Sequence, residues 1–108
     1  MNRYRLEEFS KGWVIGNFLP SLFVNSNFEI AVKFFKSGDS EPEHKQITGT
    51  EITIVVDGWI SMGGNNYERG DVIVIEPGEV CGFNSITDSS LVCVKFPSLP
   101  HDKVIVNE

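Results

Sequence analysis

Apolar and polar residues alternate with a period of two along much of this chain. Residues 28–35 show the pattern on two faces: Phe28, Ile30, Val32 and Phe34 on one, and Glu29, Ala31, Lys33 and Phe35 on the other. Alternation of this kind, rich in β-branched and aromatic residues, predicts β-strands. Strands are expected over 28–35, 50–56, 59–62, 71–76, 80–84 and 91–96. Residues 71–76 are apolar on both faces, which is typical of a central strand.

Turn residues separate the predicted strands. Turns are expected at 38–40, 57–58, 63–66, 70–71 and 77–78. Asp57-Gly58 predicts a hairpin with 59–62 as its return strand, because glycine adopts positive φ without steric cost. Leu6–Phe9 is compatible with a short helical or 3₁₀ turn, and no long amphipathic helix is expected. Six to eight short strands in one small domain predict an all-β sandwich or closed barrel.

Composition and charge narrow the class of protein. The 108 residues, 41% hydrophobic and 22% charged, suffice for one globular domain. The net charge of −6 and the scattered basic residues argue against nucleic-acid binding. No apolar run reaches the roughly 20 residues that span a bilayer, and the first residues lack a secretory signal. We therefore expect no membrane association, a cytoplasmic location and free thiols at Cys81 and Cys93.

Polar side chains gather around the predicted strand at 50–56. His44 and Gln46 are two residues apart, so on a strand they project from the same face. Glu51 shares its face with Thr53 and Val55, and this more polar face is expected to line a cavity. Imidazole, amide oxygen and carboxylate together suit a first-row divalent ion.

The segment from Gly38 to Gly58 resembles the first conserved motif of the cupin superfamily, G-x5-H-x-H-x3-4-E-x6-G. Gly38, His44, Glu51 and Gly58 fall in register with it. Gln46 departs from it, because it stands where the motif has a second histidine.

The second cupin motif, G-x5-P-x-G-x2-H-x3-N, is recognisable in a worn form. Gly70 and Gly78 match, and Pro77 lies one position late. Cys81 stands in place of the histidine, and Ser85 in place of the asparagine. The resemblance covers residues 28–97 and implies an antiparallel jelly roll, the cupin-type barrel.

The resemblance also implies a ligand set. The family's metal ligands correspond to His44, Gln46, Glu51 and Cys81 in this chain. Thiolate and imidazole favour zinc, iron, nickel or copper over magnesium. The residues leave other roles open: a surface loop for His44, a pocket wall for Gln46, and an ordinary buried thiol for Cys81.

Aromatic residues have two candidate roles. Trp59, Tyr67 and Phe83 are candidates for the edge of the ligand cavity, with core or dimer packing as the alternative. Residues 1–27, rich in Trp and Phe, are expected to form an N-terminal arm with the first short strands, packing on the barrel of residues 28–108 or on a partner subunit. A homodimer is therefore expected.

Three functions are compatible with these residues. The first is binding of a divalent metal, a small molecule of the sugar or organic acid class, or both, with metal-dependent catalysis as one outcome. The second is a non-catalytic or structural cupin that has lost its metal site. The third is a metal-free isomerase, which ranks lowest because His44 and Tyr67 are the only acid–base pair available. The sequence leaves open whether the protein is an enzyme.

Overall fold

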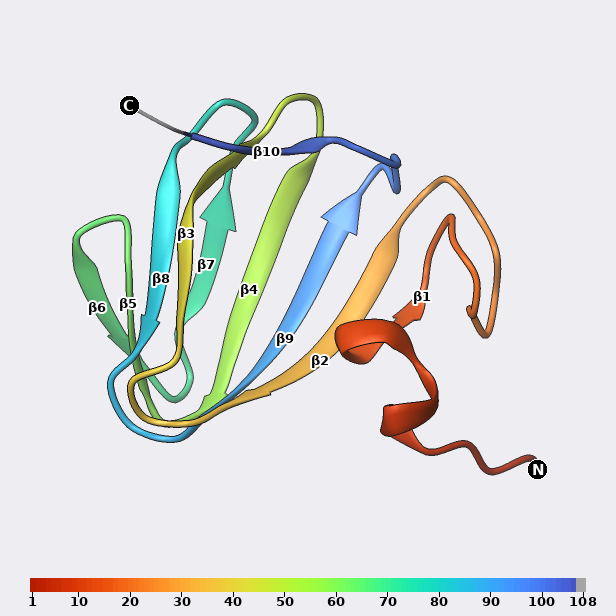
Figure 1. Ribbon diagram of the computed structural model, residues 1–108, viewed down its shortest axis with the longest axis horizontal. Helices are drawn as coiled ribbons and strands as arrows, with labels where there is room; N and C mark the ends of the chain where they lie inside the picture. Colours follow the sequence, from red (N-terminus) through yellow and green to blue (C-terminus); the bar gives the residue numbers. More distant parts are fainter. Residues whose placement is uncertain (107–108) are drawn as a thin grey trace.

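The period-two alternation becomes ten short strands in the computed structural model, which describes residues 1–106 (Figure 1). Positions 107 and 108 of the predicted barrel lie outside the described residues. The elements are the 3₁₀ turns η1 (Leu6–Glu8) and η2 (Ser10–Gly12) and the strands β1 (Trp13–Ile15), β2 (Glu29–Phe35), β3 (Ser40–Gln46), β4 (Thr50–Asp57), β5 (Trp59–Met62), β6 (Asn65–Glu68), β7 (Val72–Ile75), β8 (Cys81–Ser85), β9 (Ser89–Phe96) and β10 (Lys103–Ile105).

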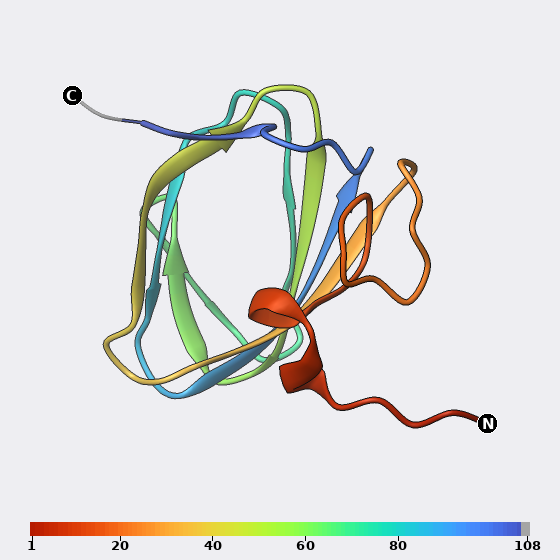
Figure 2. The ribbon, with the colours of Figure 1, turned by 45° about the vertical axis from the view of Figure 1, so that its right-hand side comes forward.

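The strands form two antiparallel five-stranded sheets. Sheet A has the order β1-β2-β9-β4-β7, and sheet B has the order β10-β3-β8-β5-β6. The two sheets face each other and enclose the interior of a barrel (Figure 2). The prediction of an all-β barrel is confirmed.

The polar face of β4 points inward, as predicted. Glu51, Thr53 and Val55 are 7%, 1% and 1% exposed. In β2, which is separated from β4 by β9, the inward face is likewise the more polar one: Glu29 and Lys33 line the interior, whereas Phe34 on the opposite face is 68% exposed. The register therefore brings the charged residues of β2, β4 and β9 into one interior.

Apolar side chains fill the rest of the interior. The buried core consists of Ala31, Val55, Ile60, Met62, Ile75, Cys81, Phe83, Leu91 and Cys93. Phe35 and Phe83 join the two sheets across this core, with ring centroids 4.5 Å apart. Cys81 and Cys93 are free thiols, as expected.

The predicted hairpin at Asp57-Gly58 is wrong. β5 does not return along β4 but crosses to sheet B, where it pairs with β8 and β6. The crossing is held by the β8–β9 connection, since the Trp59 carbonyl accepts hydrogen bonds from the amides of Ile86 and Thr87. A glycine is needed at position 58 because the β8–β9 connection approaches its backbone closely. It is not needed for a hairpin turn.

The prediction that residues 71–76 form a central strand is also wrong. β7 is the edge strand of sheet A, and Val72 and Val74 are 63% and 52% exposed. A run that is apolar on both faces predicts burial of both faces, but here the outer face of an edge strand carries the aliphatic residues.

Four strands were not among those predicted from alternation. β3 and β6 contain few apolar residues, and β1 and β10 are only three residues long. These strands form because partners supply their hydrogen bonds: β3 lies between β10 and β8, and β1 pairs with the edge of β2. Asn65 and Asn66, predicted as part of a turn, begin β6.

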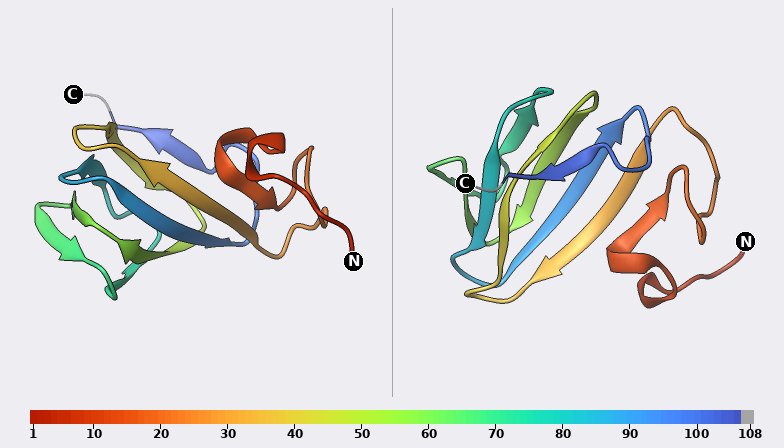
Figure 3. Two further views of the ribbon diagram at one scale, coloured as in Figure 1. Left: turned by 90° about the horizontal axis from the view of Figure 1, so that it is seen from below. Right: turned by 45° about the horizontal axis from the view of Figure 1, so that its top comes forward.

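The N-terminal segment lies at the β2 side of sheet A, and β10 lies along β3 at the edge of sheet B (Figure 3). The η2 turn contacts β2 directly. In residues 1–106, no helix has the length and apolar character needed to cross a membrane.

Candidate functional site

A cavity of about 250 Å³ opens into the barrel between the two sheets. Its apolar wall includes Met62, Phe83 and Leu91. Its polar lining is unusually charged for a protein interior: Lys11, Glu29, Lys33, Glu41, His44, Glu51, Lys95 and Lys103. A charged interior of this kind is stable only where the charges are paired or reach water.

Three charged residues form one inward rung across sheet A. In the strand register Lys95 of β9 lies directly between Glu29 of β2 and Glu51 of β4. The Lys95 ammonium is 3.8 Å from a Glu51 carboxylate oxygen, and both side chains are largely buried. The other Glu51 oxygen accepts a hydrogen bond of 2.9 Å from the Thr53 hydroxyl. Glu51 is thus held as a fixed carboxylate facing the cavity.

Burial raises the pKa of Glu29 above its usual value. The positive charge of Lys95 and a 3.1 Å hydrogen bond from the Ser98 hydroxyl act in the opposite direction. Because desolvation is the larger effect, the Glu29 carboxyl holds its proton to a higher pH than an exposed glutamate does. It can therefore donate a hydrogen bond over a wider range of pH.

Two lysines converge on the indole of Trp13. The register pairs Trp13 with the small residue Ala31, which leaves room above the sheet for the ring. The ammonium groups of Lys33 and Lys95 lie 5.2 and 4.9 Å from the ring centroid. The electron-rich face of the indole stabilises both cations. Both positive charges therefore lie beside one aromatic ring at the cavity wall.

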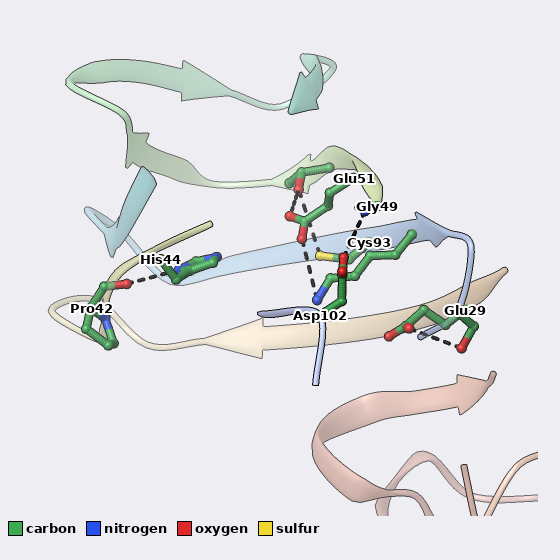
Figure 4. Close-up of polar contacts among 10 residues, drawn as sticks. Glu29, Pro42, His44, Gly49, Glu51, Cys93 and Asp102 are labelled. Carbon is green, nitrogen blue, oxygen red and sulfur yellow. Dashed lines mark hydrogen bonds and ion pairs between the residues drawn. The ribbon is translucent and has the colours of Figure 1, made fainter. Parts of the chain in front are cut away.

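His44 enters the cavity from the opposite sheet (Figure 4). Its Nδ1 atom is 3.0 Å from the Pro42 carbonyl oxygen. A carbonyl accepts hydrogen bonds, so Nδ1 carries the proton in neutral imidazole and Nε2 is left as the acceptor. A bulge in β3 between Glu41 and His44 lets both side chains line the cavity. The free Nε2 can bind a ligand proton or exchange one.

The other predicted residues are divided between the cavity, the core and the surface. Thr53 and Phe83 line the cavity. Tyr67 packs against the hydrophobic core, and Trp59 is 47% exposed on the outer side of β5. Cys81 is buried within the hydrophobic core.

Gln46 lies beside a second hollow of about 290 Å³, which shares Glu29, Lys95 and Lys103 with the first. Its side chain is almost fully buried, and among the described residues its Nε2 atom finds no hydrogen-bond partner. A buried donor without an acceptor is costly. The Gln46 amide is therefore suited to an oxygen of a bound molecule.

The predicted metal-ligand set of His44, Gln46, Glu51 and Cys81 stays a prediction. In the part of the chain that the structure describes, no three His, Cys, Asp or Glu side chains are grouped so as to hold one. Glu51 is engaged by Lys95 and Thr53, and burial raises the pKa of the Cys81 thiol, which keeps it protonated. The assignment of metal ligands therefore rests on the motif resemblance alone.

The sequence reasoning missed the most highly charged part of the site. Lys33, Lys95, Glu29 and Trp13 were not predicted as site residues. The available signal was the alternation over 28–35, since it placed Glu29 and Lys33 on the face that turned out to be internal.

Asp102 was also missed. Its carboxylate accepts hydrogen bonds from the amides of Thr48 and Gly49, at 2.9 and 2.8 Å, and so fixes the β3–β4 turn (Figure 4).

The pKa of the Cys93 thiol tests whether the interior is shielded from water. Burial raises the pKa of its thiol to about 11, with the negative charge of Glu51 acting in the same direction. The folded state therefore keeps the proton to a higher pH than the unfolded chain does. The resulting stabilisation is complete below the pKa of the unfolded thiol and is lost as the pH rises through about 11.

We expect Cys93→Ala to remove this pH dependence. Between pH 7.5 and 10.5 the wild type should lose about 2 kcal/mol more of its free energy of unfolding than the variant does. Urea unfolding under reducing conditions at the two pH values measures the difference. Equal losses in the two proteins would show that the Cys93 thiol is not shielded from water.

Comparison with known proteins bears on the fold. No family model matches the sequence, and no curated protein matches it. Among solved structures, an uncharacterised conserved protein from Klebsiella pneumoniae with a double-stranded beta-helix domain has a TM-score of 0.76 and 15% identity, over 98% of this chain and 92% of that one. A histidine-to-glutamine variant of Streptomyces PAC13, solved with uridine, has a TM-score of 0.74 and 15% identity, over 99% and 92%. A sugar phosphate isomerase from a cupin superfamily, from Silicibacter pomeroyi, has a TM-score of 0.61 and 18% identity, over 66% and 51%.

These similarities establish the class of fold. The protein has the double-stranded β-helix, or cupin, fold that the motif resemblance implies. At identities below 20% the similarity extends to the fold and leaves function to the residues of the site.

Proposed function

We propose that the barrel binds a small polar molecule of the sugar or organic acid class, with its anionic group against Lys33 and Lys95. One observation carries the proposal. Four of the nine basic residues, Lys11, Lys33, Lys95 and Lys103, line one cavity of a chain whose net charge is −6. Ammonium groups in a partly desolvated pocket attract an anion, and Lys33 and Lys95 share one aromatic neighbour there.

The remaining lining suits the body of such a molecule. Glu51 offers a fixed carboxylate that accepts hydrogen bonds from ligand hydroxyls. Gln46 offers a donor, and the Nε2 atom of His44 offers an acceptor. Phe83 and Leu91 supply an apolar wall for carbon atoms. Several hydroxyls and one anionic group match this combination better than a purely apolar ligand does.

The structural neighbours support the same class of ligand. One was solved with uridine and another is a sugar phosphate isomerase, so barrels of this shape accommodate sugar-containing molecules.

Trp13 provides a direct test, because the proposed ligand lies beside its ring. The chain has two tryptophans, and Trp59→Phe leaves Trp13 as the single fluorophore. We expect titration with sugar acids, sugar phosphates and small carboxylates to change the fluorescence saturably for at least one compound, and the matching neutral sugar to have a weaker effect. In the same background Lys33→Met should weaken binding at least about tenfold, since a charge-assisted contact contributes about 1.5–3 kcal/mol. Lys36→Met, which removes an exposed lysine outside the cavity, is the matched control and should bind normally.

The same titration addresses the metal hypothesis. We expect protein stripped with EDTA to bind as well as untreated protein, since the charged groups named above are the protein's own. Binding that disappears with EDTA and returns with zinc would instead support the predicted site at His44 and Glu51. Binding that Lys33→Met and Lys36→Met leave equally strong would contradict the proposed anion site.

A further inference from the structure

The side-chain amide of Gln46 is buried without a hydrogen-bond partner of its own. The side chain is 3% exposed and lines the second hollow, and within residues 1–106 its Nε2 atom donates to no acceptor. An apolar side chain of the same length would avoid the cost of this unpaired donor. A ligand that supplies an acceptor removes the same cost when it binds. The Gln46 amide therefore indicates a specific ligand oxygen in the second hollow.

The second hollow adjoins the cavity of the proposed anion site. Glu29, Lys95 and Lys103 line both spaces. His44 lines the cavity and Gln46 lines the hollow, and these two residues of β3 lie on the same face, roughly 7 Å apart along the strand. Either space alone is smaller than the roughly 300–1,000 Å³ of a typical small-molecule site, whereas the two together fall within that range. One ligand therefore fits the two spaces together.

The two spaces differ in the balance of their charges. Lys11 and Lys33 line the cavity alone, so that four lysines and three glutamates meet there. In the hollow two lysines are matched by two carboxylates, one of which, Asp102, already accepts hydrogen bonds from two backbone amides. The cavity therefore favours the anionic end of a ligand, and the hollow favours a neutral end.

Apolar side chains form part of the wall of the hollow. Phe18, Pro97 and Leu99 line it together with Gln46. A carbonyl oxygen suits an N–H donor in such a wall, because it has two lone pairs and no polar hydrogen that needs a further partner. The alkyl part of an acyl group would occupy the space beside Phe18 and Leu99. An acyl group thus matches both the donor and its apolar surroundings.

We propose, on the basis of the anion site described above, that the ligand is a small anion carrying an N-acyl group, such as an N-acetyl sugar phosphate or an N-acetyl hydroxy-acid analogue. Its anionic group lies against Lys33 and Lys95 in the cavity. Its acyl carbonyl extends into the second hollow and accepts a hydrogen bond from the Nε2 atom of Gln46. Gln46 therefore selects acylated anions over parents that have a hydroxyl group at the same position.

Isothermal titration calorimetry with two matched pairs of compounds tests this selectivity. The pairs are N-acetylglucosamine 6-phosphate with glucose 6-phosphate, and N-acetylalanine with lactate; in each pair a hydroxyl replaces the acetamido group. Wild-type protein should bind at least one acetylated compound at least about threefold more tightly than its partner, since that compound alone satisfies the buried donor. Gln46→Met should bind both members of that pair equally. Asn84→Met is the matched control, because it removes an exposed carboxamide of β8 outside both spaces, and it should keep the wild-type preference.

Thermal unfolding separates this role of Gln46 from a structural one. Gln46→Met keeps the length of the side chain and removes an unpaired buried donor, so without ligand its melting temperature should be no lower than that of the wild type. A lower melting temperature would assign the amide to the stability of the fold and overturn the proposal.

The titrations also distinguish this proposal from the anion site on which it rests. Lys33→Met should weaken both members of a pair by the same factor and leave their ratio unchanged. If the hydroxyl compounds bind and the acetyl group adds nothing, or if Gln46→Met keeps the preference, the acyl assignment is overturned and the anion site stands. If none of the four compounds binds, both proposals are overturned.

Discussion

Replacing Gly58 with alanine is expected to lower the free energy of unfolding by about 2–5 kcal/mol. Two costs combine at this position. Gly58 has φ of +90°, a left-handed conformation that strains any residue with a Cβ atom. A Cβ atom here would also lie 2.2 Å from the Asp88 carbonyl oxygen and 2.9 Å from the Ser89 Cα atom. These are backbone atoms, so the clash is relieved only by moving the chain where it crosses between the sheets.

Gly64→Ala separates the two costs. Gly64 has φ of +83°, close to that of Gly58, but an added Cβ atom would meet nothing within 4 Å. Its substitution should therefore cost only the conformational strain, about 1–2 kcal/mol. Urea or thermal unfolding of both variants gives the comparison. Equal losses of the free energy of unfolding in the two variants would mean that the β8–β9 connection is free to move away from Gly58. The close approach would then not fix the crossing of the chain between the sheets.

Replacing Ile60 with alanine should cost about 2–5 kcal/mol, the range for removing a fully buried aliphatic side chain. Ile60 has no exposed surface and belongs to the core cluster, where β5 lies between β6 and β8. The removed atoms leave a cavity that two paired neighbouring strands prevent from closing. If Ile60→Ala does not fold, Ile60→Val should cost about 0.5–1.5 kcal/mol.

Ile47→Ala is the matched control for Ile60. Ile47 is 59% exposed in the turn between β3 and β4, so it undergoes the same chemical change without loss of a buried contact. Its variant should unfold within about 0.5 kcal/mol of the wild type. A similar loss at both positions would show that the sheet B side of the core is loosely packed.

Alternation and glycine spacing predicted the parts of the fold that depend on local sequence. The strands at 28–35, 50–56 and 91–96 are strongly apolar, and the structure contains β2, β4 and β9 at these places. The inward direction of Glu51 and Thr53 was also predictable, because successive side chains on a strand alternate between its two faces. The four-residue ligand assignment stays a prediction, since the structure brings His44 and Glu51 to one cavity but leaves Cys81 in the core.

Pairing between distant strands accounts for what the sequence did not reveal. Asp57-Gly58 has the composition of a hairpin turn, yet β5 leaves β4 for the other sheet because β8 and β6 supply its hydrogen bonds. β3 contains no aliphatic residue, so its pattern carries no strand signal, and its place is set by β8 and β10.

By itself, the sequence determined the all-β class of the fold and the face of β4 that turns inward. Each of these follows from residues near one another in the chain, where a two-residue period and positive-φ glycines constrain the backbone directly. Only the tertiary structure decided that Lys33 and Lys95 meet the Trp13 ring, and that Lys95 lies between Glu29 and Glu51. These groupings depend on the register between strands far apart in the sequence, which is fixed when the sheets pair and pack.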